Sequence, residues 1–433
     1  MTDAQARRQL QRLMTWLEQF KVCFGRRAQL LALRRYVQGL LSDSARKSME
    51  AMLARVTDPG SYQAFQYFIS DAKWDADRVW RRLREVLPVR EGMVIIDGTS
   101  FPKQGEASVG VARQYCGALG KIANCQVAVT AALWHRARAY LVGAQLYLPE
   151  AWLTPAARDR AKVPSTTTFQ EKWRQAVALL HDIRRDGVRI TGVLADAEFG
   201  DTTAFRAVLH AGEIPYAVGI SSHLTVFRGR PPVTVPPSPA VGRPRTRGRV
   251  PTHIRPEAVA AIAGRQRRWT TVSWRNTPGA PAWTVRAMAL RVTPAHDWQR
   301  TLAPEIWLLC ERDTGRTPRT KYFFVHLPAT ASLKQLVTFA HQRWAIEQQY
   351  QELKTELGFD HFEGRSLPGW QHHAVLTALT YNFLQIERAR RHPTLTFPQL
   401  RAIVQEIFTA YLFAQQPRYL RRIEALKGVQ LRI

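Results

Sequence analysis

Two aspartates follow apolar runs that are typical of buried strands. Asp97 comes directly after "MVII" in the stretch "MVIIDGTSFPKQG", and Asp196 follows "ITGVLA". Catalytic groups of open α/β sheets often gather beyond strand ends, so two neighbouring strands would bring these carboxylates together. Hard oxygen ligands suit magnesium, and the pair therefore suggests a divalent-metal site. Taken singly, an aspartate after a strand is more often a turn former or a helix cap.

A third carboxylate is offered by the helical stretch "RWAIEQQYQELK". Glu347 lies in a semi-apolar part of this stretch, as a partly buried acid would. Arg343 lies four residues before it and Lys354 seven residues after it, so the three side chains are expected on one helix face. The alternative is an ordinary surface ion pair, which contributes little. Glu352 and Glu356 lie further around the helix and are weaker candidates.

Basic and aromatic side chains accompany these acids. Lys103, Arg113 and Lys121 follow the first apolar strand, and Arg365 follows the helix with the third acid. We expect these four to contact DNA phosphates, although a solvated surface charge is an equally common reading of each. Four tryptophans in residues 221–330 could stack on an unpaired base, but each is more commonly a core residue. They are Trp269, Trp274, Trp283 and Trp298.

The composition points to a polyanionic partner. The 433 residues, enough for two to four structural units, hold 62 Lys plus Arg against 34 Asp plus Glu, a formal charge of +28. We find no apolar run of membrane-spanning length and no signal-peptide pattern, so we expect DNA as the partner, no membrane, and a cytoplasmic location. Four scattered cysteines without a C-x-x-C pair argue against a zinc ribbon or a disulfide framework.

The hydrophobic pattern divides the chain into four parts. Residues 1–90 have helical periodicity and are expected to bind DNA. Residues 91–220 mix short β-rich runs with helical ones, which predicts the first part of an α/β core. Residues 221–330 are β-rich and basic, and eight prolines within 229–256 predict an extended, mobile loop. Residues 331–433 are helical again, and we expect one long helix from "SLKQL" to "TELG" followed by packing helices.

Three blocks of this sequence resemble DDE-type insertion-sequence transposases, most closely insertion-sequence family 701. They are "IIDGTSFPKQGEASVGVARQYCGALGKIANCQVAV", "VLADAEFGD" and "RWAIEQQYQELKTELGFDHFEGRS". The resemblance, over roughly residues 25–390, implies a metal-binding catalytic triad of Asp97, Asp196 and Glu347. It places Arg343 and Lys354 at the basic positions of the family's Y-R-E-K signature. The signature tyrosine falls at Ala340, and the second aspartate that many members carry after the first is Gly98 here.

The resemblance also implies a fold and an activity. The expected fold is an RNase H-like mixed-sheet core with the basic β-rich segment inserted before the catalytic glutamate, flanked by helical regions. The expected activity is cut-and-paste transposition: cleavage of transposon ends and strand transfer into target DNA, with two Mg²⁺ ions or Mn²⁺ in their place. Expected partners are the terminal inverted repeats, target DNA and a second copy in a synaptic complex, on the bacterial nucleoid.

Other readings remain open at this point. One is an RNase H-like nuclease without strand transfer, and the long insertion and the basic N-terminal region argue against it. A domesticated DNA-binding protein without catalysis is disfavoured by the complete triad. A glycosidase would also use paired acids at strand ends, but a charge of +28 does not suit a neutral sugar.

Overall fold

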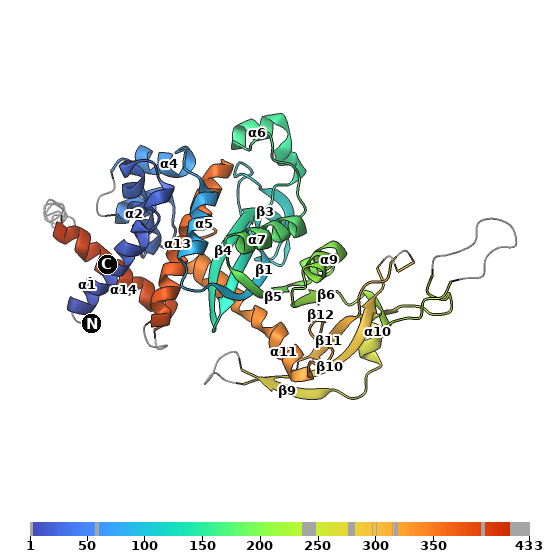
Figure 1. The fold of residues 1–433 in the computed structure, drawn as a ribbon. Coiled ribbons are helices and arrows are strands. Elements are labelled where there is room, and N and C mark those ends of the chain that lie inside the picture. The colour runs from blue at the N-terminus through green and yellow to red at the C-terminus, as the bar shows by residue number, and fades with distance from the viewer. Residues whose placement is uncertain are drawn as a thin grey trace.

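A single mixed sheet runs through the protein, with a helical bundle at one end (Figure 1). The computed structural model describes residues 3–56, 60–235, 248–275, 282–296, 298–299, 301–313, 315, 319–390 and 395–415. In this described part of the chain, each helix is too short or too polar to cross a membrane.

The core of the sheet has the strand order β4-β3-β1-β5-β6. These strands are β1 (Glu91–Pro102), β3 (Lys121–His135), β4 (Arg138–Leu146), β5 (Arg189–Ala195) and β6 (Tyr216–Ile220). The strands β1, β5 and β6 run parallel, whereas β3 is antiparallel to both of its neighbours β1 and β4. This order and these directions are those of an RNase H-like core, as expected. A short strand, β2 (Ala112–Cys116), forms a hairpin with the start of β3.

The central strands are apolar at nearly every position because both faces of the sheet are covered. Successive residues of β1 alternate between two cores: Val94 and Ile96 belong to one, and Met93 and Ile95 to the other. The helix α7 (Lys172–Arg185) packs against β3 and β4. The remaining helices of this region are α6 (Pro155–Ala161), α8 (Ala197–Gly200) and α9 (Thr203–Ala211), after a 3₁₀ turn at Glu150–Leu153.

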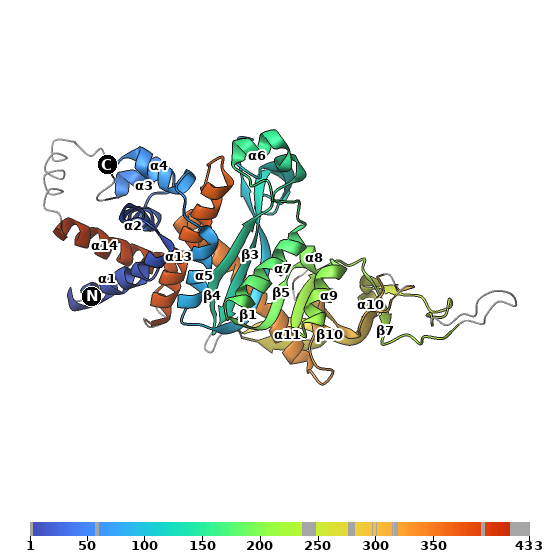
Figure 2. The same ribbon diagram turned by 45° about the horizontal axis from the view of Figure 1, so that its top comes forward.

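The segment between β6 and the last helices extends the same sheet. Its β12 pairs with β6 in antiparallel fashion, so the sheet continues through β11, β10 and β7 to β8 (Figures 1 and 2). Its elements are β7 (Thr225–Arg228), β8 (Glu257–Ala258), α10 (Val259–Gly264), β9 (Thr270–Trp274), β10 (Trp283–Pro294), β11 (Ile306–Arg312) and β12 (Thr320–His326). Much of the expected proline-rich loop, residues 236–247, lies outside the described residues.

The two ends of the chain build one helical bundle around α13 (Leu367–Arg390), which is buried over most of its length (Figure 2). The other members are α1 (Asp3–Glu18), a 3₁₀ turn at Lys21–Cys23, α2 (Arg27–Leu41), α3 (Met49–Arg55), α4 (Tyr62–Ser70), α5 (Ala76–Val86) and α14 (Phe397–Gln415). The bundle is fixed by long-range contacts such as the Arg12–Glu387 ion pair at 2.6 Å and the Tyr36–His373 hydrogen bond at 2.8 Å. Residues 1–90 therefore cover the apolar surface of α13.

The expected long helix around the third acid is present as one continuous helical segment, but it is not a regular α-helix throughout. It consists of α11 (Leu333–His341), a 3₁₀ turn at Gln342–Trp344, α12 (Ala345–Gln351) and a π-helical turn at Glu352–Glu356. Its two ends are held by different partners. The His341 ring lies 2.8 Å from the buried Glu311 carboxylate on β11, whereas the buried Glu352 accepts hydrogen bonds from α13. The irregular turns allow this one segment to contact both β11 and α13. Turns of π-helix are frequent at functional sites.

Candidate active site

Asp97 lies in the middle of β1 and not at its end, which corrects the sequence-based expectation. The strand continues to Pro102 because β3 pairs with it over its full second half. On the opposite edge, however, β5 pairs with β1 only as far as Ile95. The edge of β1 is therefore open beside Asp97, and the acid still stands where the parallel neighbour stops. Asp97 itself is 8% exposed.

Asp196 directly follows β5, as predicted, and it also caps the next helix. Its Oδ1 accepts a hydrogen bond of 3.0 Å from the backbone N–H of Glu198 at the start of α8. The short helix lies tightly against β6: a Cβ on Gly200 would stand 1.8 Å from the carbonyl oxygen of Gly219. Glycine at position 200 thus fixes α8, and with it Asp196, beside the open edge of β1.

The two aspartates lie in a poorly solvated environment. Burial raises the pKa of Asp97 to about 7, with the Asp196 charge adding to the rise and Arg343 opposing it. Burial also raises the pKa of Asp196, and the nearby Glu198 carboxylate acts in the same direction. Such an excess of buried negative charge favours the binding of a cation.

Arg343 connects the first and third acids. Its guanidinium lies 3.7 Å from Asp97 Oδ1 and 3.5 Å from Glu347 Oε1. The Glu347 side chain is 61% exposed, so the expectation of a partly buried acid is wrong. Within the described residues, no three His, Cys, Asp or Glu side chains form a group that could hold a metal ion. Asp97 and Glu347 are connected through the guanidinium of Arg343, which lies between them.

The donor set nevertheless fits a hard divalent cation. Asp97 and Asp196 approach from neighbouring parallel strands and offer only oxygen atoms, which are the ligands that Mg²⁺ prefers. The buried Asp97 carboxylate is met by Arg343 at 3.7 Å, which is longer than a hydrogen bond, so this acid retains capacity for a closer cation. Glu347 contacts the same guanidinium from the solvent side.

A cleft of about 400 Å³ opens beside these acids. Asp196, Arg343 and Glu347 line it together with Lys321 and Trp344, two residues that the sequence analysis did not single out. Both side chains are exposed, and they come from β12 and the 3₁₀ turn before α12. No sequence motif marks Lys321, because it reaches the cleft only through the pairing of β12 with β6.

One tryptophan of the insertion lies next to this cleft. Trp283 is 49% exposed, and its ring centroid lies 6.1 Å from that of the cleft residue Trp344. Trp274 is buried and stacks on His341 at 4.0 Å, Trp269 lies under the Arg312 guanidinium, and Trp298 packs edge-on against Phe227. The packing interpretation thus holds for three of the four, whereas Trp283 is free to meet a base.

Hydrogen bonds from Lys354 and Lys103 connect β1 and the residue that follows it with the chain after Glu347. Lys354 Nζ donates a hydrogen bond of 3.1 Å to the carbonyl oxygen of Ser100, and burial lowers its pKa. Lys103 Nζ donates to the carbonyl oxygens of Asp360 and Phe362 at 2.9 and 2.7 Å. Arg343 and Lys354 both reach β1. For both lysines, a DNA contact stays a prediction.

The other predicted basic residues do not line the cleft. Arg113 and Lys121 are exposed on the β2–β3 hairpin, and Arg365 is exposed in the loop before α13. Their DNA contacts also stay predictions. Glu352 and Glu356 lie outside the site: Glu352 accepts hydrogen bonds from α13, and Glu356 forms an ion pair of 2.7 Å with Arg401.

Behind Asp97 lies a pair of hydroxyl groups that the sequence analysis did not identify. Thr130, the partner of Asp97 across β3, donates to the Asp97 carbonyl oxygen at 3.4 Å. The hydroxyl of Tyr350 lies 2.5 Å from Thr130 Oγ1. Tyr350 stands three residues after Glu347, so helical spacing could have found it. This pair fixes α12 against the strand that carries Asp97.

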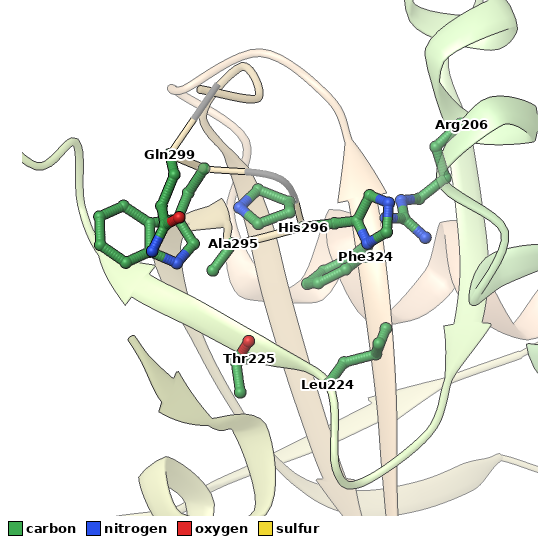
Figure 3. A pocket seen from close by; sticks show the side chains of 9 residues that line it. Arg206, Leu224, Thr225, Ala295, His296, Gln299 and Phe324 are labelled. Atoms are coloured by element: carbon green, nitrogen blue, oxygen red, sulfur yellow. The ribbon is translucent and has the colours of Figure 1, made fainter. Parts of the chain in front are cut away.

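A second cavity, of about 540 Å³, lies on the other face of the sheet (Figure 3). Its wall includes Arg206, Thr225, His296 and Phe324, and the described residues that line it include no acid. Phe323, the next residue on β12, lines the cleft with Glu347 instead. The two cavities are therefore separated by the sheet, and the acids belong to one of them.

Comparisons with known proteins bear on the family to which this chain belongs. The family model described as DDE superfamily endonuclease matches residues 19–279, a stretch that contains Asp97 and Asp196 and ends before Glu347. The probable transposase for insertion sequence element IS701 of Microchaete diplosiphon is 29% identical over 190 residues, which are 43% of this chain and 47% of that protein. This chain thus matches about half the length of that relative.

Among solved structures, the piggyBac transposase synaptic complex with hairpin DNA aligns with a TM-score of 0.47 and 10% sequence identity. That alignment covers 94% of this chain and 74% of the other. The RNase H-like assignment made above depends on strand order and direction. Because the family model matches more than half of the sequence, this protein belongs to the DDE superfamily endonucleases.

Proposed function

We propose that the protein is a DNA transposase that cleaves transposon ends and transfers the cut strands into target DNA in a metal-dependent reaction. The observation that carries this proposal is the meeting of the buried Asp97 with Asp196 at the open edge of β1, in a chain of the DDE superfamily. A formal charge of +28 supports DNA as the substrate.

Asp97, Asp196 and Glu347 are the residues that would hold the metal. Bound Mg²⁺ supplies Lewis-acid stabilisation of the leaving 3′-oxygen and lowers the pKa of an attacking water or 3′-hydroxyl. Two ions are expected, with Mn²⁺ as a substitute. The acids would hold the ions from two strands and one helix, while leaving the cleft side open for DNA.

The cationic and aromatic lining of the cleft would position the DNA strand. Arg343 is placed to hold Glu347 and to meet a phosphate through its planar fork of N–H donors. Lys321 offers a further cation from the other wall of the cleft. The exposed Trp283 and Trp344 rings offer a surface on which an unpaired base would stack.

Recognition and assembly are the remaining parts of the proposal. The helical region of residues 1–90 is proposed to read the terminal inverted repeats, and two copies are proposed to act in one synaptic complex. The single experiment is incubation of the full chain with Mg²⁺ and a DNA that carries the element's terminal repeats. Cleavage at the 3′ end followed by joining supports the proposal. Cleavage without joining would favour the nuclease reading, and binding without cleavage would favour a non-catalytic protein.

The triad is tested in the same assay. Asp97→Ala, Asp196→Ala or Glu347→Ala should each abolish cleavage and leave DNA binding largely intact. Glu363→Ala is a matched control for Glu347→Ala, because the Glu363 side chain is 57% exposed and forms an ion pair with Arg46. A triad variant that cleaves at the wild-type rate removes that residue from the active site.

A further inference from the structure

A buried carboxylate contacts one residue of the cleft that contains Glu347. Glu311 lies on β11, and its side chain is only 2% exposed. Its Oε2 lies 2.8 Å from Nε2 of His341, the last residue of α11. Its other oxygen, Oε1, is buried without a hydrogen-bond partner among the described residues. A carboxylate removed from water is costly unless a positive charge lies beside it, and His341 is the basic side chain that contacts Glu311.

His341 is also part of the cleft wall, which it forms together with Asp196, Arg343 and Glu347. Its ring is fixed by two contacts: Glu311 binds Nε2, and the buried Trp274 ring stacks on it with the ring centroids 4.0 Å apart. The side chain remains 21% exposed. In the part of the chain that the structure describes, Nδ1 of His341 has no hydrogen-bond partner. This leaves Nδ1 as the ring atom for a ligand.

A second basic side chain lies next to the same carboxylate. Lys321 is directly opposite Glu311 in the antiparallel pairing of β11 with β12, so the two side chains lie on one face of the sheet. Lys321 is exposed and lines the same cleft as His341. Two basic residues from different elements therefore meet beside one buried acid, and both line the cleft.

We propose that His341 binds a phosphate of the DNA strand in this cleft, and that Glu311 positions the ring and balances its charge. In this arrangement the imidazolium donates Nε2–H to Glu311 and Nδ1–H to a phosphate oxygen, and Lys321 adds a positive charge nearby. Hydrogen bonds between charged groups are the strong ones, and a ring that is already fixed loses little freedom on binding. This inference rests on the proposed function, since it concerns the same cleft and the same DNA. No covalent step is involved.

The test is DNA binding by the full chain in EDTA at pH 6, where an unperturbed histidine is mostly protonated. The probe is DNA that carries the element's terminal repeats, and fluorescence anisotropy gives its affinity at a series of salt concentrations. His341→Gln removes the positive charge, while its amide N–H can still donate to Glu311. This variant should bind about tenfold more weakly or worse, and the slope of log affinity against log salt should fall by about 0.9, the value for one phosphate contact. A wild-type slope would overturn the inference.

Matched variants separate a lost phosphate contact from a damaged fold. His181→Gln removes an exposed histidine of α7 that does not line the cleft, and it should keep the wild-type slope. His341→Lys keeps a positive charge at this position and should also keep that slope. If His341→Lys binds as weakly as His341→Gln, the charge of residue 341 does not serve DNA binding. Thermal melting shows whether each variant is folded.

The sign of the Glu311→Gln effect tests the positioning role. Removal of a negative charge beside bound DNA would by itself raise DNA affinity. If Glu311 holds the imidazolium in place, Glu311→Gln should instead lower the affinity and the salt slope. Addition of His341→Gln should then cause no further loss, because both substitutions remove the same contact. The double variant retains a neutral pair that can still hydrogen bond, so it also serves when His341→Gln alone does not fold. A higher affinity of Glu311→Gln would exclude the positioning role.

The absence of metal in this assay separates the inference from the proposed function. If the wild type cleaves and joins DNA while His341→Gln keeps the wild-type salt slope, the inference about His341 alone fails. If the wild type binds DNA but cleaves none when Mg²⁺ is supplied, the proposed function fails. A reduced slope of His341→Gln would still establish the phosphate contact in that case.

Discussion

Asp97 should destabilise the folded protein at neutral pH when no metal is bound. Its carboxyl is 8% exposed, and burial raises its pKa from 3.8 to about 7. The folded state therefore binds a proton that the unfolded state releases between about pH 4 and pH 7. Since stability falls with rising pH wherever the folded state holds more protons, this acid lowers stability progressively across that window. Below about pH 4 the penalty is absent, and above about pH 7 it is complete.

The size of the effect follows from the two pKa values. Each pKa unit corresponds to about 1.36 kcal/mol, so a rise from 3.8 to about 7 gives about 4 kcal/mol as an upper bound. Asp97→Asn keeps the shape and removes the charge. The pKa of about 7 already includes the attraction to Arg343, but the asparagine amide also loses hydrogen bonds to water when it is buried, so we expect a net gain of about 1–3 kcal/mol at pH 8.

The assay is urea unfolding of wild type and Asp97→Asn in EDTA at pH 4.5 and pH 8. The two proteins should differ little at pH 4.5, and the variant should be the more stable at pH 8. Glu347→Gln is the control, because its side chain is 61% exposed and its charge should have little effect at either pH. Equal stabilities at pH 8, or a less stable Asp97→Asn, would refute the claim that the buried Asp97 charge destabilises the folded protein.

Four further outcomes are expected from the site and the charge. Arg343→Lys should reduce cleavage at least tenfold, measured as single-turnover rates, because an ammonium cannot bridge two carboxylates as a guanidinium does; cleavage at the wild-type rate would contradict this role. Lys354→Ala should lower strand transfer more than bulk DNA affinity, compared with Lys334→Ala on the exposed side of α11; equal joining by both would remove Lys354 from the active site. DNA affinity should fall by roughly 10³–10⁵ between 50 and 200 mM salt, measured by fluorescence anisotropy, if about six to ten phosphates are contacted; a flat curve would oppose the electrostatic reading. Alanine at the exposed Arg26 and Arg27 should reduce discrimination between repeat and random DNA, whereas unchanged discrimination would move recognition elsewhere in the chain.

Two alternative variants are unsuitable for these experiments. Truncation of residues 1–90 would uncover the buried surface of α13, so loss of DNA recognition could not be separated from unfolding. Glu352→Ala is equally unsuitable as a reference for Lys354→Ala, because Glu352 is buried and accepts hydrogen bonds from Tyr381 and Gln385. Point variants at exposed positions avoid both problems.

The sequence by itself determined the type of core and two of its acids. Apolar runs with β-rich composition around Asp97 and Asp196 predicted buried strands, and both strands lie at the centre of the sheet. These signals are local, because a strand covered on both faces must be apolar at nearly every position. The helical periodicity of residues 1–90 was equally local, and it predicted helices there.

The tertiary structure alone decided how the acids are placed. Asp97 is internal to β1 because β3 continues to pair beyond the point where β5 ends, and pairing length cannot be read from one strand. The irregular helical geometry around Glu347 accompanies partners of His341 and Glu352 on β11 and α13, which are far apart in sequence. Lys321 and Trp283 join the site only through long-range contacts. Local sequence patterns indicate which side chains must be buried. Which charged groups lie close together depends on how segments that are distant in sequence pack against one another.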